Sequence, residues 1–303
     1  MNQNKPIALG LWPIAGVTTI GVTRDDALAT IQAAIDNGIT TFDTAFSYGY
    51  DGESDRILGE FLRKHRERFY VIGKVGQRWT ASHERAIDGS EKQLTADAEE
   101  SLKRLGIDQF DLLMLHMVDP NIDIETSAAT IATLQRRGLC RDTGVCNITA
   151  DQRRAFANSA ACNAIQTPLN LLQREALNEL VPECIVDDCN VYVYWTLMKG
   201  LLAGKITRDH QFAEGDSRPK YPIFQGEARR RTHDILDALQ PIADASGMTI
   251  AQLSISWAVS QPGITAALVG ARRPDQILET CNAGRRSKEI VDQIDAVVQQ
   301  HGG

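Results

Sequence analysis

Short apolar runs alternate with longer amphipathic stretches along most of the chain. Uninterrupted apolar runs are typical of parallel strands that are buried on both faces, whereas apolar positions spaced three and four residues apart are typical of helices that cover them. The first unit shows both patterns, because residues 7–11 form an apolar run, and Ala27, Ile31 and Ala34 then recur at helical spacing within residues 24–37. The chain therefore predicts strands that alternate with helices.

The same unit recurs to the end of the chain, and its first helix carries the residues expected at helix ends. Thr23 precedes that helix as an N-cap, and Gly38 follows it where a C-terminal cap is expected. The predicted strands are residues 7–11, 39–43, 70–74, 112–115, 142–145, 164–166, 191–194 and 267–269. The predicted helices are residues 24–37, 54–64, 94–105 and 124–137, one from about residue 151, one before residue 190, two after an extended loop within residues 205–260, and two at residues 275–282 and 289–300.

Eight strands that are each followed by a helix predict an α/β fold, a (β/α)8 TIM barrel with eight parallel strands and extra helices near the C-terminus. We expect a single domain over residues 1–303. The competing fold is a doubly wound open sheet, which usually carries a Gly-x-Gly-x-x-Gly motif after its first strand. The segment after Leu11 has no such motif, so the barrel is favoured.

Composition narrows the class of protein. The net charge of -7 argues against a general affinity for nucleic acid. No run of about 18 apolar residues predicts a membrane span, and the N-terminus lacks the features of a signal peptide, so we expect a cytoplasmic protein. The six cysteines form no Cys-x-x-Cys pair and no ligand spacing with the six histidines, which predicts reduced thiols and no metal site.

Chemically useful side chains follow three consecutive predicted strands. In a barrel of this kind the reaction takes place at the carboxyl ends of the strands, where the sequence has Asp43, Lys74 and His116, with Tyr48 in the loop after Asp43. A carbonyl group that accepts hydride develops negative charge on its oxygen, which needs a proton donor and stabilisation. We expect Tyr48 to donate the proton and His116 to orient the carbonyl.

A phenol is a weak acid at neutral pH, so the expected proton donor needs help from its neighbours. A nearby ammonium group favours phenolate, and we therefore expect Lys74 to lower the pKa of Tyr48. Asp43 is the expected partner that keeps Lys74 charged. Three strands and one loop would in this way bring an acid, a base, an imidazole and a phenol to one small region.

These segments resemble the aldo-keto reductases. Residues 42–45 (Phe-Asp-Thr-Ala) with Tyr48 close behind resemble the family's second-strand signature, Lys74 its third-strand lysine and His116 its fourth-strand histidine. The resemblance extends from residues 10–12 (Gly-Leu-Trp) to about Asn282. It implies reduction of a small carbonyl substrate with NADPH, and a catalytic tetrad that maps onto Asp43, Tyr48, Lys74 and His116.

The resemblance also implies a cofactor site on the later strands. Residues 144–147 (Gly-Val-Cys-Asn) resemble a motif that usually reads Gly-Val-Ser-Asn, so Asn147 and Gln166 would bind the nicotinamide carboxamide and Tyr194 would stack on its ring. Cys146 replaces the usual Ser, which weakens one hydrogen bond and places an oxidisable sulfur beside the nicotinamide. Residues 195–198 also differ from the usual Ser-Pro-Leu-Gly.

The segment after the eighth strand is the expected phosphate site. It opens a predicted helix, whose free N–H groups and dipole attract phosphate, and arginine adds paired hydrogen bonds. The family's 2'-phosphate and adenosine contacts map onto Gly270, Arg272, Gln276 and Glu279, and the adjacent Arg273 also favours NADP over NAD. The charged loop at residues 212–218 either closes over the pyrophosphate or is mobile.

Aromatic side chains surround the expected substrate pocket. Trp12 resembles a family position that lines the pocket, Trp79 in the loop after Lys74 is a second candidate, and Phe46 precedes the tyrosine. They predict an apolar mouth of the kind that is typical of small-molecule sites.

Two other functions use the same residues. One is a barrel aldolase in which Lys74 forms a Schiff base. The other is a non-catalytic regulator that keeps the barrel and binds NADPH, as channel beta subunits of this superfamily do. The complete tetrad favours the reductase over both.

Overall fold

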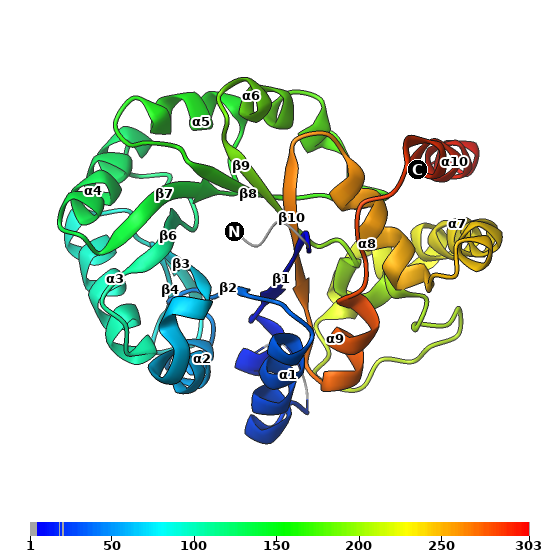
Figure 1. Ribbon diagram of the computed structural model, residues 1–303, viewed down its shortest axis with the longest axis horizontal. Coiled ribbons are helices and arrows are strands. Elements are labelled where there is room, and N and C mark those ends of the chain that lie inside the picture. The colour runs from blue at the N-terminus through cyan, green and yellow to red at the C-terminus, as the bar shows by residue number, and fades with distance from the viewer. Residues whose placement is uncertain (1–4, 18, 20, 303) are drawn as a thin grey trace.

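The computed structural model describes residues 5–17, 19 and 21–302 as a closed barrel of eight parallel strands surrounded by helices (Figure 1). The barrel strands are β1 (Ile7–Gly10), β2 (Thr41–Asp43), β3 (Tyr70–Val75), β6 (Phe110–Leu115), β7 (Cys140–Cys146), β8 (Ala164–Pro168), β9 (Asn190–Tyr194) and β10 (Ile264–Gly270). Their order around the barrel is β1-β10-β9-β8-β7-β6-β3-β2. The predicted TIM barrel is confirmed, and the open doubly wound sheet is excluded.

Helices follow the strands as the sequence pattern predicts. The α-helices are α1 (Arg24–Asp36), α2 (Glu53–His65), α3 (Glu91–Leu105), α4 (Ile124–Arg136), α5 (Ala150–Ala157), α6 (Leu180–Val186), α7 (Gly226–Ala245), α8 (Ile250–Ser260), α9 (Pro274–Thr280) and α10 (Lys288–Gln300). The short 3-10 helices are η1 (Pro13–Ala15), η2 (Arg66–Arg68), η3 (Glu175–Leu177), η4 (Met198–Ala203), η5 (Arg218–Lys220) and η6 (Pro222–Phe224). The extra helices near the C-terminus, α7, α8 and α10, lie on one side of the barrel (Figure 1).

The first helix is capped as predicted. The Thr23 hydroxyl accepts a hydrogen bond of 3.1 Å from the Asp26 backbone N–H, and the Asp26 carboxylate accepts one of 3.2 Å from the Thr23 N–H. This reciprocal pair satisfies two donors that a helix start otherwise leaves free. Gly38 follows the helix with φ +80°, a left-handed conformation that glycine adopts without strain.

Both faces of the barrel strands are buried, which explains why their sequences are apolar without alternation. One face packs under the helices in a large core that includes Leu9, Val71 and Leu113. The other face fills the inside of the barrel, so the barrel is a packed core rather than a channel. The interior residues are Ala8, Ile72, Leu112, Met114, Cys146, Ala164, Tyr192, Ala266 and Leu268.

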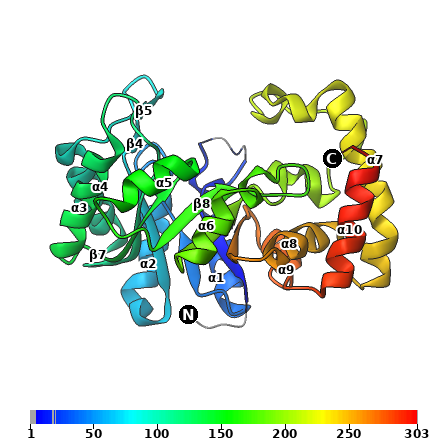
Figure 2. The ribbon, with the colours of Figure 1, turned by 90° about the horizontal axis from the view of Figure 1, so that it is seen from above.

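A small antiparallel hairpin between β3 and α3 was not among the predicted elements. It consists of β4 (Gln77–Trp79) and β5 (Arg85–Ile87), in which Trp79 lies opposite Arg85. Figure 2 shows this hairpin at the same end of the barrel as the long connection between β9 and α7. That end is the carboxyl end of the strands, where Asp43 and Lys74 lie.

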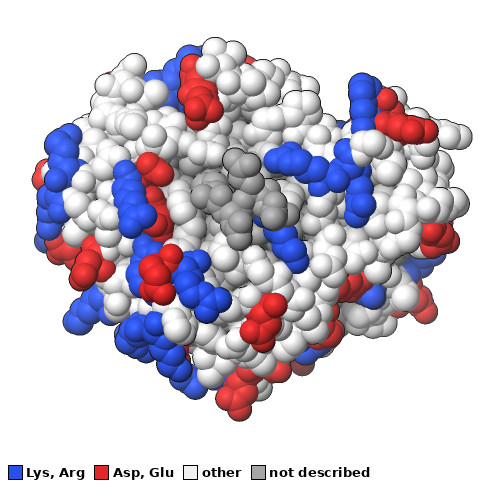
Figure 3. All heavy atoms as spheres, in the orientation of Figure 1, with Lys and Arg blue, Asp and Glu red and all other residues white. Residues whose placement is uncertain are grey.

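The opposite end of the barrel faces the viewer in Figures 1 and 3. Acidic and basic side chains are interspersed across that face in Figure 3, without a continuous basic surface on the side that is visible.

A buried carboxylate connects the loop after β2 to two helices. Asp55 of α2 is fully buried, and it accepts hydrogen bonds from the Thr44 hydroxyl at 2.5 Å and from the Ser101 hydroxyl of α3 at 2.6 Å. Burial raises the pKa of Asp55 to about 6, against the opposing effects of both hydroxyl donors and of Arg104. Asp55 therefore fixes the start of the loop that carries Tyr48.

The raised pKa gives stability a pH dependence that can be measured. The folded protein binds the Asp55 proton more tightly than the unfolded chain does. The stabilisation that the protonated carboxyl provides is therefore complete below pH 3.8, the usual pKa, and is lost as the pH rises through about 6. We expect the unfolding free energy of the wild type to fall by about 2 kcal/mol, relative to Asp55→Asn, between about pH 4 and about pH 7. Urea unfolding at several pH values measures this difference.

The exposed Asp108 provides the control, because Asp108→Asn changes the same charge without a buried partner. A wild-type stability that stays parallel to that of Asp55→Asn over the whole pH range would contradict the assignment.

Candidate active site

Three of the residues predicted to be catalytic form one bonded group at the carboxyl end of the barrel. The Lys74 ammonium donates to the Asp43 carboxylate at 2.7 Å, to the Thr44 carbonyl oxygen at 3.0 Å and to the Tyr48 hydroxyl at 3.1 Å. Parallel pairing of β2 with β3 sets this geometry, because it aligns Asp43 with Ile72, two residues before Lys74. The Lys74 side chain is buried, so its charge has to be compensated by partners within the protein rather than by water.

The charges of this group determine which protons are held. Burial acts to lower the pKa of Lys74, but the negative charge of Asp43 and the neighbouring Tyr48 outweigh it and raise the pKa above its usual value. Lys74 is therefore an ammonium throughout the physiological range.

The expected lowering of the pKa of Tyr48 is wrong in its net direction. Burial raises the pKa of Tyr48 to about 12, and Asp43 acts in the same direction, while Lys74 opposes them. The physical reason is that a buried phenolate loses more hydration than one ammonium returns. Tyr48 is consequently a protonated donor at neutral pH, and it can still protonate an alkoxide, which is far more basic than a phenolate.

His116 completes the predicted group just beyond β6. Its ring lies edge-on to Tyr48, with the two ring centroids 5.8 Å apart, and its Nδ1 is buried without a partner among the described residues. Burial, followed by the charges of Lys74 and Arg85, holds the pKa of His116 well below its usual value. A neutral imidazole of this kind can donate one hydrogen bond and accept another.

The predicted nicotinamide-binding residues are connected to the same network. Gln166 of β8 donates to the Asp43 carboxylate at 2.7 Å. Asn147 donates to the His116 carbonyl oxygen at 2.9 Å and accepts from the Tyr194 hydroxyl. These contacts join β2, β7, β8 and β9 across the mouth of the barrel, so the structure brings the two predicted sets of residues together.

Cys146 differs from its expected behaviour. Its thiol donates weakly to the Gln166 side-chain oxygen at 3.7 Å. The side chain is buried, and burial raises the pKa of the thiol. The expectation of an oxidisable sulfur is therefore wrong, because the thiolate is the reactive form and this site suppresses it.

Positive charge accumulates where α9 begins. Arg272 is half-buried, and burial together with the charges of Arg218 and Arg273 lowers its pKa. Arg218 is held by Asp216, and Arg273 is paired with Asp275, but within the described residues Arg272 forms no ion pair. An anion bound here would offset the repulsion between the three guanidinium groups, which fits the predicted phosphate site.

The other predicted adenosine contacts are placed around this cluster. The Gln276 side-chain oxygen accepts a hydrogen bond of 3.0 Å from the Arg272 backbone N–H. A Cβ on Gly270 would lie 2.7 Å from the ring of Pro13, so a larger residue would push η1 away from the strand end. Glu279 forms an ion pair of 3.3 Å with Lys205.

Aromatic rings form the wall above Tyr48. The rings of Trp12 and Tyr48 meet edge to face at 5.2 Å, and the Trp79 indole N–H donates to the Ser47 carbonyl oxygen at 2.9 Å. Phe46 was expected at this mouth, but its ring packs instead beneath Arg104, at 4.7 Å. The reason is that the Arg104 side chain, which is largely buried, also reaches the Phe46 carbonyl oxygen.

Arg85 is a residue of this mouth that the sequence analysis missed. It lies between Trp12 and Trp79, on a hairpin strand of three residues. So short a strand has no apolar periodicity that could have revealed it. The available signal was the position of the segment, directly after a strand that carries a predicted catalytic residue.

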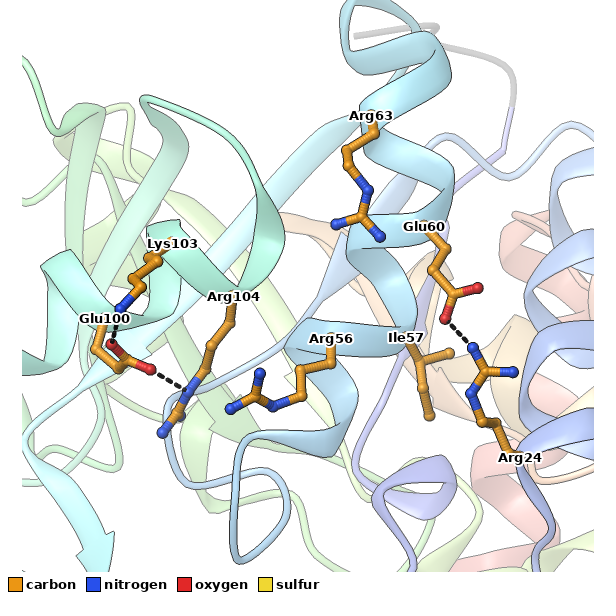
Figure 4. A pocket seen from close by; sticks show the side chains of 8 residues that line it. All are labelled: Arg24, Arg56, Ile57, Glu60, Arg63, Glu100, Lys103 and Arg104. Carbon is orange, nitrogen blue, oxygen red and sulfur yellow. Dashed lines mark hydrogen bonds and ion pairs between the residues drawn. The ribbon is translucent and has the colours of Figure 1, made fainter.

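A hollow of about 670 Å³ on the outside of the barrel lies away from this chemistry (Figure 4). It is lined by side chains of α1, α2 and α3, and its walls carry arginine–glutamate pairs such as Arg24 with Glu60 and Arg104 with Glu100. Figure 4 shows these pairs along the helices, without a proton donor of the Tyr48 kind. None of the residues predicted to be catalytic lines this hollow.

Comparison with known proteins agrees with the geometry. The model of the Aldo/keto reductase family matches residues 6–299. An aldo-keto reductase of Bacillus subtilis, YhdN, is 33% identical over 89% of this chain and 82% of its own length. An NADH-specific methylglyoxal reductase of Escherichia coli is 32% identical over 91% of this chain and 89% of its own length.

A solved structure shares the whole architecture. The glycerol dehydrogenase AKR11B4 of Gluconobacter oxydans superposes with a TM-score of 0.90 at 30% identity, covering 98% of this chain and 92% of that one. The match over nearly the full length, together with the closed barrel, shows that this chain belongs to the aldo/keto reductase family.

Proposed function

We propose that this chain is an NADP-dependent carbonyl reductase in which Tyr48 donates the proton to the substrate oxygen. The family supports an oxidoreductase that acts on small carbonyl compounds with a nicotinamide cofactor. The observation that carries the finer assignment is the bonded group of Tyr48, Lys74 and Asp43, with the His116 ring 5.8 Å from the Tyr48 ring. That arrangement offers both a proton and a hydrogen bond to one oxygen atom.

The residues present fit a nicotinamide dinucleotide. Its nicotinamide supplies the hydride when bound. Asn147 and Gln166 would bind the carboxamide, and Tyr194 would stack on the ring. Arg272 would bind the 2'-phosphate, and Gly270, Gln276 and Glu279 would lie near the adenosine. The unpaired, crowded charge of Arg272 supports this half of the site, because a phosphate is the anion that a half-buried guanidinium binds well.

The chain's own groups then perform the proton chemistry. The carbonyl oxygen lies between the Tyr48 hydroxyl and the neutral His116 ring, which fixes its direction. As negative charge develops on that oxygen, Tyr48 gives up its proton, and the Lys74 ammonium, 3.1 Å away, stabilises the phenolate that remains. Asp43 keeps Lys74 charged and in place. The reverse reaction, alcohol oxidation, uses the same groups with Tyr48 as the base.

The choice of NADP over NAD depends on Arg272. One relative is by name NADH-specific, so membership of the family leaves the choice open. The crowding of Arg272 by Arg218 and Arg273 supports a site for an extra phosphate, because each further positive charge strengthens the attraction to a dianion.

The two competing functions are less well supported. A Schiff-base aldolase needs a neutral lysine, whereas Asp43 holds Lys74 as an ammonium. A regulator without activity would have no need for a phenol that is hydrogen-bonded to a buried ammonium beside an imidazole ring. The remaining predictions concern location and domain organisation. None of the helices in the described part of the chain is long and apolar enough to cross a membrane. The cytoplasmic location and the single-domain organisation remain predictions.

Loss of the phenol tests the mechanism. We expect Tyr48→Phe to lower kcat for 4-nitrobenzaldehyde reduction by about 1,000-fold, because general acid catalysis contributes on the order of 100- to 10,000-fold. NADPH binding, followed by fluorescence, should change little. Tyr50→Phe is the matched control, because Tyr50 is a nearby exposed phenol outside the bonded group. A Tyr48→Phe enzyme with a nearly unchanged kcat would remove the phenol from the mechanism.

Loss of the guanidinium tests the cofactor assignment. We expect Arg272→Ala to lower kcat/KM for NADPH by about 100-fold and that for NADH by no more than about threefold, because only NADPH carries the 2'-phosphate. Steady-state kinetics with both cofactors measure this difference. Arg230→Ala, which removes an exposed arginine of α7, controls for net charge. Equal losses with the two cofactors would place the 2'-phosphate elsewhere.

A further inference from the structure

An arginine is held between two tryptophans at the mouth of the barrel. The guanidinium carbon of Arg85 lies 4.2 Å from the ring centroid of Trp79 and 4.7 Å from that of Trp12. Trp79 lies directly opposite Arg85 in the hairpin of β4 and β5, whereas Trp12 follows β1, which only β2 separates from β3. Contacts with two indoles fix the position of the charge without neutralising it.

In the part of the chain that the structure describes, no carboxylate pairs with the Arg85 charge. Within the described residues, its side chain forms a hydrogen bond with the Gln77 side-chain oxygen but no ion pair with a carboxylate. A guanidinium touches aromatic rings with its face, while its five N–H donors lie in its plane. Most of these donors therefore remain available, in the fork that matches a carboxylate or phosphate.

This charge is close to the reacting groups. Trp12 contacts Arg85 on one side and the Tyr48 ring, at 5.2 Å, on the other, so a single indole spans the gap between guanidinium and phenol. The positive charge of Arg85 also contributes to the lowered pKa of His116. A small molecule that reaches Tyr48 through this mouth therefore comes close enough to Arg85 to interact with its positive charge.

The cofactor phosphates do not account for this arginine. Their candidate site is at Arg272, after β10, whereas Arg85 belongs to the hairpin after β3. Two strands, β1 and β2, separate β10 from β3 around the barrel. The anion that Arg85 binds must therefore arrive with the other reactant.

We propose that Arg85 binds an anionic group of the substrate, so that the preferred substrates are aldehydes or ketones with a carboxylate or phosphate a few bonds from the carbonyl. This inference rests on the proposed reductase function. Arg85 would bind the anionic end of the substrate, Trp12 and Trp79 would pack against the middle of the substrate, and its carbonyl group would reach Tyr48 and His116. The same cation excludes positively charged carbonyl compounds.

A pair of substrates that differ only in charge tests the proposal. We expect the wild type to reduce 4-carboxybenzaldehyde with a higher kcat/KM than its methyl ester. Arg85→Gln, which keeps a polar side chain next to Gln77, should lower kcat/KM for the acid by about 10- to 100-fold, mainly through KM, and that for the ester by less than about twofold. Arg85→Lys should fall between the two, because it keeps the charge but loses the fork.

Further arms identify the anion and control for charge. Glyceraldehyde 3-phosphate compared with glyceraldehyde gives the phosphate counterpart, and the larger Arg85 effect of the two pairs names the preferred anion. Arg56→Gln changes the net charge equally on an exposed helix surface and should leave both ratios unchanged. Equal losses for acid and ester in Arg85→Gln would show that the arginine only holds the hairpin, which overturns the proposal.

A binding measurement separates this inference from the reductase assignment. Benzoate, which cannot be reduced by hydride transfer here, should quench the fluorescence of the wild type through Trp12 and Trp79, and Arg85→Gln should weaken its binding by about tenfold or more. Absence of turnover with every aldehyde would defeat the proposed function but leave this readout. A benzoate affinity that is equal in both proteins would overturn the role of Arg85.

Discussion

The buried ion pair between Lys74 and Asp43 is the interaction on which the rest of the site depends. An ammonium removed from water costs several kcal/mol unless it is paired and hydrogen-bonded, so a partner has to lie within contact distance. Asp43, the Thr44 carbonyl and the Tyr48 hydroxyl satisfy it at 2.7 to 3.1 Å. The position of the phenol is thereby tied to that of the charge, and the phenolate that the proposed mechanism forms would have a cation already in place.

The closed barrel makes this arrangement continuous with the rest of the mouth. Asp43 on β2 also accepts a hydrogen bond from Gln166 on β8, across the barrel. The proposed proton donor and the proposed cofactor site therefore share a carboxylate. Positive charge is distributed in three places, with Lys74 at the reacting oxygen, Arg272 at the start of α9 and Arg85 on the hairpin. In the proposed complex these charges would face the developing oxyanion, the 2'-phosphate of the cofactor and the anionic group of the substrate.

The sequence predicts regular features well and local electrostatics poorly. Apolar runs buried on both faces identify the barrel strands, and capping residues such as Thr23 identify the helix start. The hairpin of β4 and β5 was missed because three-residue polar strands leave no periodic signal. The pKa of Tyr48 was expected in the wrong direction because the sequence shows neighbours but not burial. The same holds for the thiol of Cys146, whose environment depends on strands distant in sequence.

Removal of the ammonium tests the central claim most directly. In a single-turnover experiment with enzyme-bound NADPH and 4-nitrobenzaldehyde, we expect Lys74→Met to bind NADPH normally but to transfer hydride about 100-fold or more slowly, because the phenolate of Tyr48 loses its stabilising cation. A Lys74→Met enzyme that transfers hydride within about threefold of the wild-type rate would contradict the dependence of the site on this buried charge.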